Sequence, residues 1–300
     1  MLNRRGFLGS AAGAALSGLA PGGAAAEPVA AAPGKPGLGR VPADEISIQL
    51  FTLRDQLARD FDGTLRRLAE IGYRRVEHGG FVGRTAADFR AALDRAGLSA
   101  TSGHVAIPQP FDADIWRAAL ADARQIGARH IIHPLFGVDA RGPIRERARW
   151  EAFAHDLNAA GKLASEAGLL FGYHNHNSEF FRLADGTGET GYGVLAAETD
   201  PAHVHFEVDL FWAWRGAVDP VDLFATVGPR VLQLHVKDLD QAGSFADPGQ
   251  GLIDFARIFR AQAVEEYIVE RDDAGTPPRA PADALDTARV GYDFLRSVSF

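Results

Sequence analysis

Histidine and carboxylate residues recur in four short runs in the second half of the sequence. The runs are YHNHNSE at 173–179, EVD at 207–209, HVKD at 235–238 and ERD at 270–272. The chain has no cysteine, so nitrogen and oxygen are the strong metal ligands that it can offer. Imidazoles and carboxylates together suit Mn, Co, Mg, Zn or Fe. Because crowded carboxylates repel each other unless a cation or a proton intervenes, the pattern predicts a polar site able to hold a metal ion.

These runs follow apolar segments that alternate with longer amphipathic ones. We expect strands at 46–51, 73–77, 98–105, 130–135, 169–174, 203–208, 231–236 and 267–270. We expect the main helices at 62–71, 85–96, 112–126, 144–167, 192–198, 221–227, 252–261 and 282–297. This alternation is typical of a parallel sheet, and eight strand–helix units in about 255 residues indicate a closed barrel. An open doubly wound sheet would need a glycine-rich turn after the first strand, and residues 51–56 contain no glycine. The sequence therefore predicts a single (β/α)8 TIM barrel over residues 45–300.

The carboxyl ends of barrel strands form one rim, where barrel enzymes place their active sites. Earlier strands bring further candidates to this rim, namely Glu77, His104 and His133. Seven of the eight expected strands thus end in or near a histidine or a carboxylate. Packing alone does not predict this recurrence, although we expect His133 to be a structural residue.

The first 26 residues have the features of an export signal. Arg4 and Arg5 precede a mild Ala/Gly/Leu stretch, and three alanines stand at 24–26. We predict a twin-arginine-type signal peptide over residues 1–26, a linker over 27–44, and an exported or periplasmic protein. The apolar stretch is too short and too rich in glycine for a stable membrane span.

The chain is acidic, with a formal net charge of -8, and removal of residues 1–26 would make it -10. A nucleic-acid partner would favour a basic surplus, so the charge argues against one. A homo-oligomer is compatible with the sequence, which identifies no interface.

Four segments carry a resemblance to a known family. YHNHNSEF at 173–180, EVDLFWAWRGAVDP at 207–220, LHVKD at 234–238 and the IVE that ends at Glu270 resemble the xylose isomerase-like TIM barrels, in particular the sugar phosphate isomerase/epimerase group. The resemblance covers about residues 45–298. It implies one divalent metal ion at the ends of strands five to eight, commonly held by Glu, Asp, His and Glu. The ligands implied here are His174, Asp209, His235 and Glu270.

The fifth-strand ligand departs from the family pattern, because His174 stands where Glu is common. His176 and Glu179 are close enough in sequence to be rival ligands. His174 and His176 share a face of the strand, so one could bind metal and the other substrate.

The resemblance also implies how the site would act. The metal would polarise a carbonyl and acidify the neighbouring C–H, giving an enediolate. The acid–base candidates are Glu270, Lys237, His176 and Glu179. The expected substrate contacts are Glu77, His104 and Trp212, since aromatic faces pack on sugar rings. Lys237 could equally be a solvated lysine at a strand end, and Arg54 either an anion anchor or a surface residue.

Three functions remain open on this evidence. The first is a metal-dependent isomerase or epimerase of a sugar, keto-sugar or inositol derivative. The second is a lyase or dehydratase on a keto-sugar or 3-keto-glycoside, which the missing fifth-strand Glu makes a serious rival. The third is a non-catalytic periplasmic sugar-binding protein, which would not need a metal-capable ring of side chains.

Overall fold

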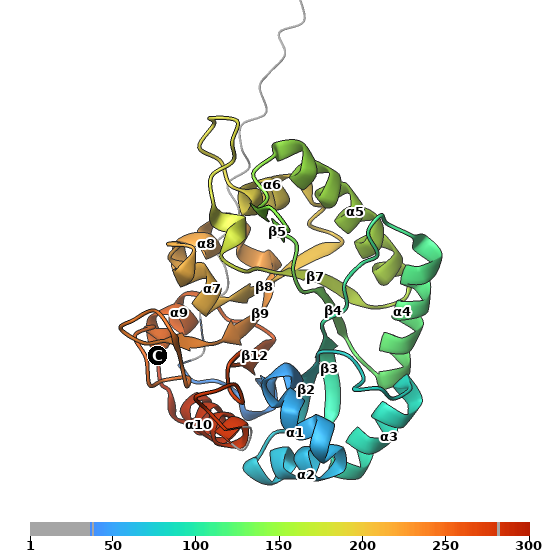
Figure 1. Cartoon of the computed structure of the whole chain (residues 1–300), viewed down its shortest axis with the longest axis vertical. Helices are drawn as coiled ribbons and strands as arrows, with labels where there is room; N and C mark the ends of the chain where they lie inside the picture. The colour runs from blue at the N-terminus through green and yellow to red at the C-terminus, as the bar shows by residue number, and fades with distance from the viewer. Residues whose placement is uncertain (1–36, 38, 281–282) are drawn as a thin grey trace, which may run out of the picture. The chain divides into compact units, whose positions relative to one another are not determined.

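The computed structural model describes residues 37, 39–280 and 283–300. The main strands lie at the centre and helices surround them (Figure 1). The central strands are β1 (Ile46–Ile48), β2 (Arg75–His78), β3 (Ser99–Gly103), β4 (His130–His133), β7 (Leu170–His174), β8 (Val204–Asp209), β9 (Val231–Val236) and β12 (Glu266–Val269). The helices are α1 (Arg54–Arg59), α2 (Phe61–Ile71), α3 (Ala86–Ala96), α4 (Ala113–Ile126), α5 (Arg147–Glu166), α6 (Gly191–Glu198), α7 (Leu210–Arg215), α8 (Pro220–Val227), α9 (Phe255–Ala261) and α10 (Asp283–Ser297).

The strands close into a parallel barrel. Six of them form one sheet in the order β1-β12-β9-β8-β7-β4, and β2 pairs with β3 in a second. Parallel bridges from Gln49 to Glu77 and from His104 to Ile132 join the two sheets at both edges. The prediction of a (β/α)8 barrel is therefore confirmed.

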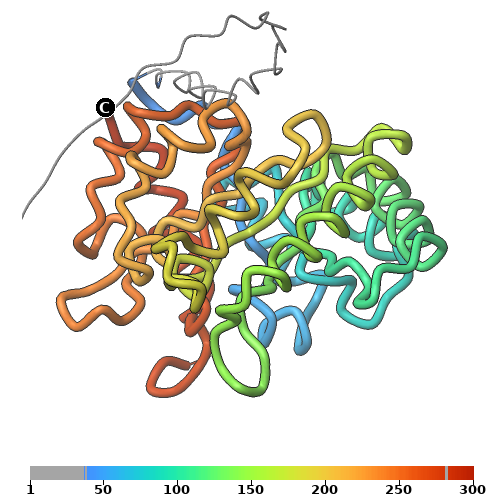
Figure 2. The backbone as a smooth tube through the Cα atoms, turned by 90° about the horizontal axis from the view of Figure 1, so that it is seen from above, coloured from blue at the N-terminus to red at the C-terminus, as the bar shows by residue number. Residues whose placement is uncertain are grey.

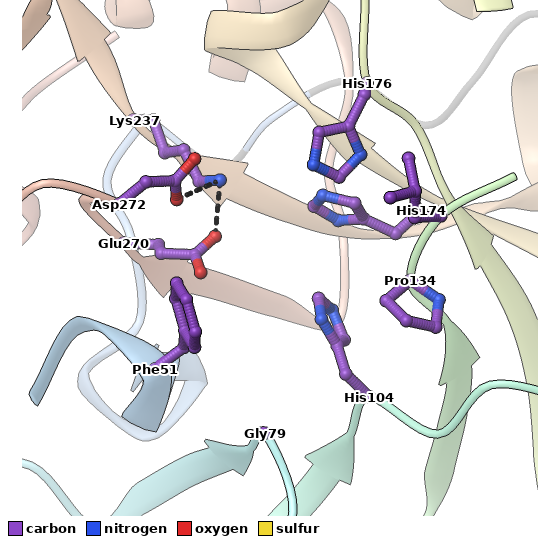
Figure 3. Close-up of a pocket in the computed structure, with 10 residues that line it drawn as sticks. Phe51, Gly79, His104, Pro134, His174, His176, Lys237, Glu270 and Asp272 are labelled. Carbon is purple, nitrogen blue, oxygen red and sulfur yellow. Dashed lines mark ion pairs between the residues drawn. The ribbon is translucent and has the colours of Figure 1, made fainter. Parts of the chain in front are cut away.

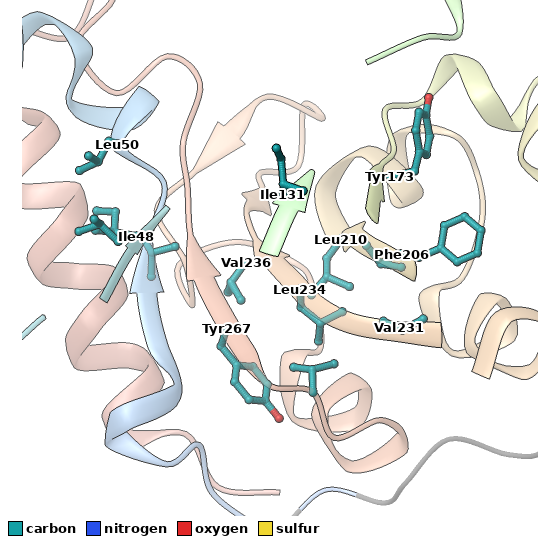
Figure 4. Close-up of a cluster of buried hydrophobic side chains, with 14 of the residues drawn as sticks. Ile48, Leu50, Ile131, Tyr173, Phe206, Leu210, Val231, Leu234, Val236 and Tyr267 are labelled. Carbon is teal, nitrogen blue, oxygen red and sulfur yellow. The ribbon is translucent and has the colours of Figure 1, made fainter. Parts of the chain in front are cut away.

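The main hydrophobic cluster packs between the strands and the helices. Leu234 and Val236 belong to this cluster (Figure 4). Successive residues of a strand face opposite sides, and His235 between them contacts Glu77 and Glu207 inside the barrel. The interior itself is mostly polar. At the amino-terminal end of the strands, Glu266 accepts a hydrogen bond from Thr101 Oγ1 and another, 3.1 Å long, from Gln233 Nε2.

Local sequence signals fix several helix ends as expected. Thr85 caps α3 by accepting the Asp88 amide, and Gly97 ends that helix with a φ of 73°, a left-handed conformation that glycine adopts readily. Asp219 begins α8 in the same way, by accepting the amide of Val221.

The sequence did not predict two short α-helices, α1 and α7. The first strand ends at Ile48 rather than residue 51, because Gln49 caps a 3-10 helix over Leu50–Leu53 that leads into α1. The second, α7, begins directly after Asp209, whose carboxylate accepts the Trp212 amide. Hairpins β5 (Val138–Asp139) with β6 (Gly142–Pro143) and β10 (Asp238–Leu239) with β11 (Phe245–Ala246) extend the rim loops.

Residues before the first strand pack against the barrel. Val41 is buried, and Arg40 forms an antiparallel bridge with Ser299, so the blue and red ends of the described chain lie side by side (Figure 2). The last residues of the expected linker thus contact the barrel, and the boundary at residue 44 stays a prediction. The predicted signal peptide at 1–26 lies outside the described residues. Among the helices that are described, none combines the length and apolar character that crossing a membrane requires.

Candidate active site

A cavity of about 390 Å³ opens at the carboxyl ends of the strands. It is lined by Phe51, Gly79, His104, Pro134, Leu135, His174, His176, Lys237, Glu270 and Asp272. Carboxylates and Lys237 lie on one wall, and three imidazoles lie on the opposite wall (Figure 3). Its place agrees with the rule that barrel sites form at this rim.

The four ligands implied by the resemblance lie together. Asp209 Oδ2 is 3.7 Å from His174 Nε2 and 4.0 Å from His235 Nδ1. His235 Nδ1 is also 2.7 Å from Glu270 Oε2. All four side chains are buried, so they are surrounded by protein groups and not by bulk water. Their role as ligands stays a prediction.

Glu207 is a central residue that the sequence reasoning did not select. Its Oε2 lies 2.8 Å from His104 Nε2, 2.8 Å from His174 Nδ1 and 3.1 Å from His235 Nε2. Its Oε1 is buried and has no hydrogen-bond partner among the described residues. The signal was present, because a residue two positions before Asp209 in a strand shares its face.

Glu77 lies below the cavity rather than on its wall. Its carboxylate accepts hydrogen bonds at 2.7 Å from Gln49 Nε2 and from Ser102 Oγ, and lies 2.7 Å from His235 Nε2. These contacts hold the carboxylate inside the barrel, and Glu77 is not among the residues that line the cavity. The expected contact with substrate is therefore not supported, and Glu77 instead orients the His235 ring.

Lys237 is buried among three carboxylates. Its Nζ lies 2.6 Å from Glu270 Oε2, 2.8 Å from Asp272 Oδ1 and 3.0 Å from Asp209 Oδ2. Burial alone would lower the lysine pKa, but the three carboxylates outweigh it and hold the pKa well above its usual value. Lys237 is thus a charged member of the site and not a solvated strand-end lysine. Asp272, which was not a predicted site residue, lines the cavity beside it.

The two walls differ in charge. Burial would raise the Glu270 pKa, but Lys237 and His235 hold it well below its ordinary value, so Glu270 is an ionised carboxylate. Burial would lower the His104 pKa, but Glu77 and Glu207 outweigh it and raise the pKa. Burial and then Lys237 lower the pKa of His176 to about 3, so that ring is neutral.

The remaining candidates lie around this centre. Glu179 is buried under the rim, where its carboxylate accepts hydrogen bonds from Tyr173 Oη at 2.7 Å, the His176 amide at 2.9 Å and Ser178 Oγ at 2.8 Å. It does not line the cavity, so the expected catalytic role is not supported, and it fixes the loop that carries His176. The Trp212 ring packs against His176 with centroids 5.1 Å apart and lies behind the wall.

Two residues have structural partners. His133 has the structural contacts expected of it: its Nδ1 accepts the Ile107 amide at 3.0 Å and its Nε2 lies 2.8 Å from Leu135 O. Arg54 covers the Phe51 ring at 4.3 Å and donates to Thr276 Oγ1 at 3.0 Å, which leaves it poorly placed to hold an anion in the cavity.

The described residues offer two groups of metal-capable donors, and each group fits a divalent ion. One comprises Asp209, His235 and Glu270, and the other His104, His174, Glu207 and His235. Imidazole and carboxylate donors suit Mn, Co, Zn or Fe, and the unpartnered Glu207 Oε1 leaves a donor free. His235 faces the two groups through different ring nitrogens.

Comparison with known proteins agrees with this geometry. The family described as xylose isomerase-like TIM barrel matches residues 65–295. The chain belongs to this family. An inosose dehydratase from Geobacillus kaustophilus is 24% identical over 265 residues, which cover 77% of this chain and 84% of the relative. With an enzyme of that kind as a relative in the same family, the chain is an enzyme.

Solved structures of this family share the fold. A sugar phosphate isomerase/epimerase from Parabacteroides distasonis superposes with a TM-score of 0.73 at 24% identity, covering 89% of this chain and 99% of that one. A probable 3-DHS dehydratase from Bacillus anthracis superposes with a TM-score of 0.64 at 13% identity, covering 84% and 98%. At these identities the likeness supports the barrel and not a particular reaction.

Proposed function

We propose that this enzyme is a lyase that eliminates water or an alcohol from a keto-sugar or a related keto-polyol. The observation that carries the proposal is the asymmetry of the cavity, with the Glu270 carboxylate, whose pKa is lowered, on one wall and the His104 imidazole, whose pKa is raised, on the other (Figure 3). Elimination needs a base for the C–H and an acid for the departing oxygen, on different atoms of the substrate. The inosose dehydratase relative points to the same class of reaction.

The proton transfers balance across the cavity. Glu270 accepts the proton from the carbon next to the ketone, and the electron pair of that C–H bond forms the new C=C bond as the C–O bond breaks. His104 gives its proton to the departing oxygen, which leaves as water or an alcohol. The product is an enone, and a proton returned from Glu270 to His104 through solvent restores both groups.

A divalent ion would be held by His235, Asp209 and Glu270, with His174 as the neighbouring donor. When bound, it supplies Lewis-acid polarisation of the ketone and so makes the adjacent C–H more acidic. Glu77 holds the His235 ring in place through its 2.7 Å contact with Nε2, which leaves Nδ1 facing Glu270 and Asp209.

The substrate that we propose is uncharged. The lysine that lines the cavity is neutralised by Asp209, Glu270 and Asp272, so a phosphate or carboxylate would meet net negative charge there. At the mouth, Phe51 is 44% exposed and Leu135 is 46% exposed. This apolar pair favours a keto-glycoside over a free keto-sugar, because the group attached to the sugar of a glycoside can pack at the mouth.

We further propose that the mature enzyme works after export. The support is the twin-arginine-type pattern at Arg4 and Arg5, together with the preference of the cavity for an unphosphorylated sugar.

A second candidate is an isomerase or epimerase of the same substrates, since it would begin with the same proton abstraction. Inversion at one carbon needs comparable proton carriers on both faces, and the described walls carry a carboxylate on one side and imidazoles on the other. This asymmetry favours elimination.

The test uses the Mn²⁺-loaded protein with 3-keto-glucosides and inososes in D₂O, followed by NMR and mass spectrometry. An enone with release of water or aglycone is expected, and Glu270→Gln and His104→Gln should each lower kcat by about 10²–10⁴-fold. His155→Gln, at an exposed site on α5, is the matched control. Deuterium at the carbon beside the ketone without elimination would support the isomerase instead, and no turnover or exchange would refute both.

A further inference from the structure

The Lys237 ammonium lies where two metal-capable carboxylates converge. Its Nζ is 3.0 Å from Asp209 Oδ2 and 2.6 Å from Glu270 Oε2. The same two oxygens lie 4.0 and 2.7 Å from His235 Nδ1, and these three residues form one of the two donor groups. The lysine therefore touches the oxygens that an ion in this group would need.

An ion at this donor group and the ammonium would compete for the same two oxygens in this arrangement. Metal–oxygen bonds to such ligands are about 2.0–2.2 Å long, so an ion bound to both oxygens would lie close against Nζ. The two cations would repel each other and compete for the same lone pairs. Lys237 is only 2% exposed, so water does not screen that repulsion.

Asp272 offers the ammonium another position. Its Oδ1 is 2.8 Å from Nζ, it belongs to neither donor group, and its side chain is 25% exposed at the cavity wall. The flexible four-carbon stem of lysine allows its head to shift while one ion pair is kept.

We propose that Lys237 is the internal counter-ion of the Asp209–Glu270 pair and that a divalent ion displaces its ammonium onto Asp272. This inference rests on the metal-assisted part of the proposed function. Lys237 keeps the acidic pair neutralised in the metal-free protein, and Asp272 sets how readily the lysine gives it up. In the loaded protein the ammonium stays at the cavity wall beside the substrate.

The test is Mn²⁺ binding to the mature chain by calorimetry and EPR, after the metal has been removed with a chelator. If the ammonium holds the pair about nine-tenths of the time, it weakens the apparent Kd about tenfold. Lys237→Met should therefore tighten Mn²⁺ binding by about that factor, and Asp272→Asn should weaken it. Lys162→Met, on the exposed face of α5, should leave the Kd unchanged.

A double variant separates displacement from simple loss of charge. If Asp272 acts by receiving the lysine, Asp272→Asn should lose its effect on the Kd in the Lys237→Met background. An equal effect in both backgrounds would show that Asp272 attracts the ion directly and would overturn the proposal.

Fold and function are controlled separately. Lys237→Met should lower the Tm of the metal-free chain, and Mn²⁺ should restore it, which shows that the variant folds. A Kd for Lys237→Met equal to or weaker than that of the parent would overturn the proposal, as would absence of binding in every variant. Tighter binding in Lys237→Met without turnover of any keto-sugar would uphold it while refuting the proposed reaction.

Discussion

Replacement of Glu179 distinguishes a structural carboxylate from a catalytic one. Its two oxygens accept three hydrogen bonds, from Tyr173, the His176 amide and Ser178, and the side chain is fully buried. Glu179→Ala removes the acceptor and leaves these buried donors without it, which should cost about 3–5 kcal/mol of unfolding free energy. For a domain of this size the Tm should fall by about 6–20 °C.

Glu179→Gln should behave differently. The Gln Oε1 can still accept from Tyr173 and the His176 amide, and the Ser178 hydroxyl can turn to accept from the new amide. The cost should then be about 1 kcal/mol, or roughly 2–4 °C in Tm, with little change in kcat. Differential scanning fluorimetry and a turnover assay on the same samples measure both quantities, with the exposed Glu166→Ala as control. A Glu179→Gln protein of normal Tm whose kcat has dropped about 100-fold or more would refute the structural interpretation.

Three further predictions follow from residues around the barrel. Burial lowers the His133 pKa to about 4, whereas the pKa in the unfolded chain is about 6.5. The neutral ring therefore contributes about 3 kcal/mol to the free energy of unfolding above pH 6.5, and this contribution is lost as pH falls toward 4. The Tm should fall less steeply with pH for His133→Gln than for the parent, and equal slopes would contradict this. Phe51→Ala should raise the KM for a keto-glycoside by about fivefold, because about 1 kcal/mol of apolar contact is lost, and should leave the KM for a free keto-sugar unchanged. Equal effects on both KM values would argue against packing of the glycoside at the mouth. Gly161→Ala should lower the free energy of unfolding by about 1–3 kcal/mol, because the new Cβ would lie 2.5 Å from the backbone oxygen of His203. An unchanged denaturant midpoint would show that α5 can move away from His203 without strain.

The fold could be predicted because its local signals agree with one another. Strand β9 has the expected bounds, and the cap Thr85 and the stop Gly97 enclose α3 as the sequence indicates. The short helix α7 escaped prediction, since six residues are too few to show a helical period. It depends on Asp209, which caps it from the strand before.

The site was predictable where one strand alone decides which way a residue faces. Asp209, His235 and Glu270 all reach the rim from strand ends, as alternation along each strand requires. The direction in which Glu207 faces was predictable from this alternation, but its role was not, because that depends on contacts with His104 and with other residues on separate strands. The role of Glu179 was not predictable either. A 3-10 turn at Ser178–Phe180 directs this side chain under the rim, although Glu179 is only three residues from His176.

The polar interior of the barrel separates the residues that hold the fold from those that do chemistry. Leu234 and Val236 secure β9 against the outer helices, while His235 between them faces the reacting space. Inward positions can therefore exchange during evolution, at little cost to the shell, provided that hydrogen bonding and charge inside stay balanced. The same separation makes this barrel a suitable scaffold for engineering, in which new inner side chains are introduced in compensating pairs while the outward residues are left untouched.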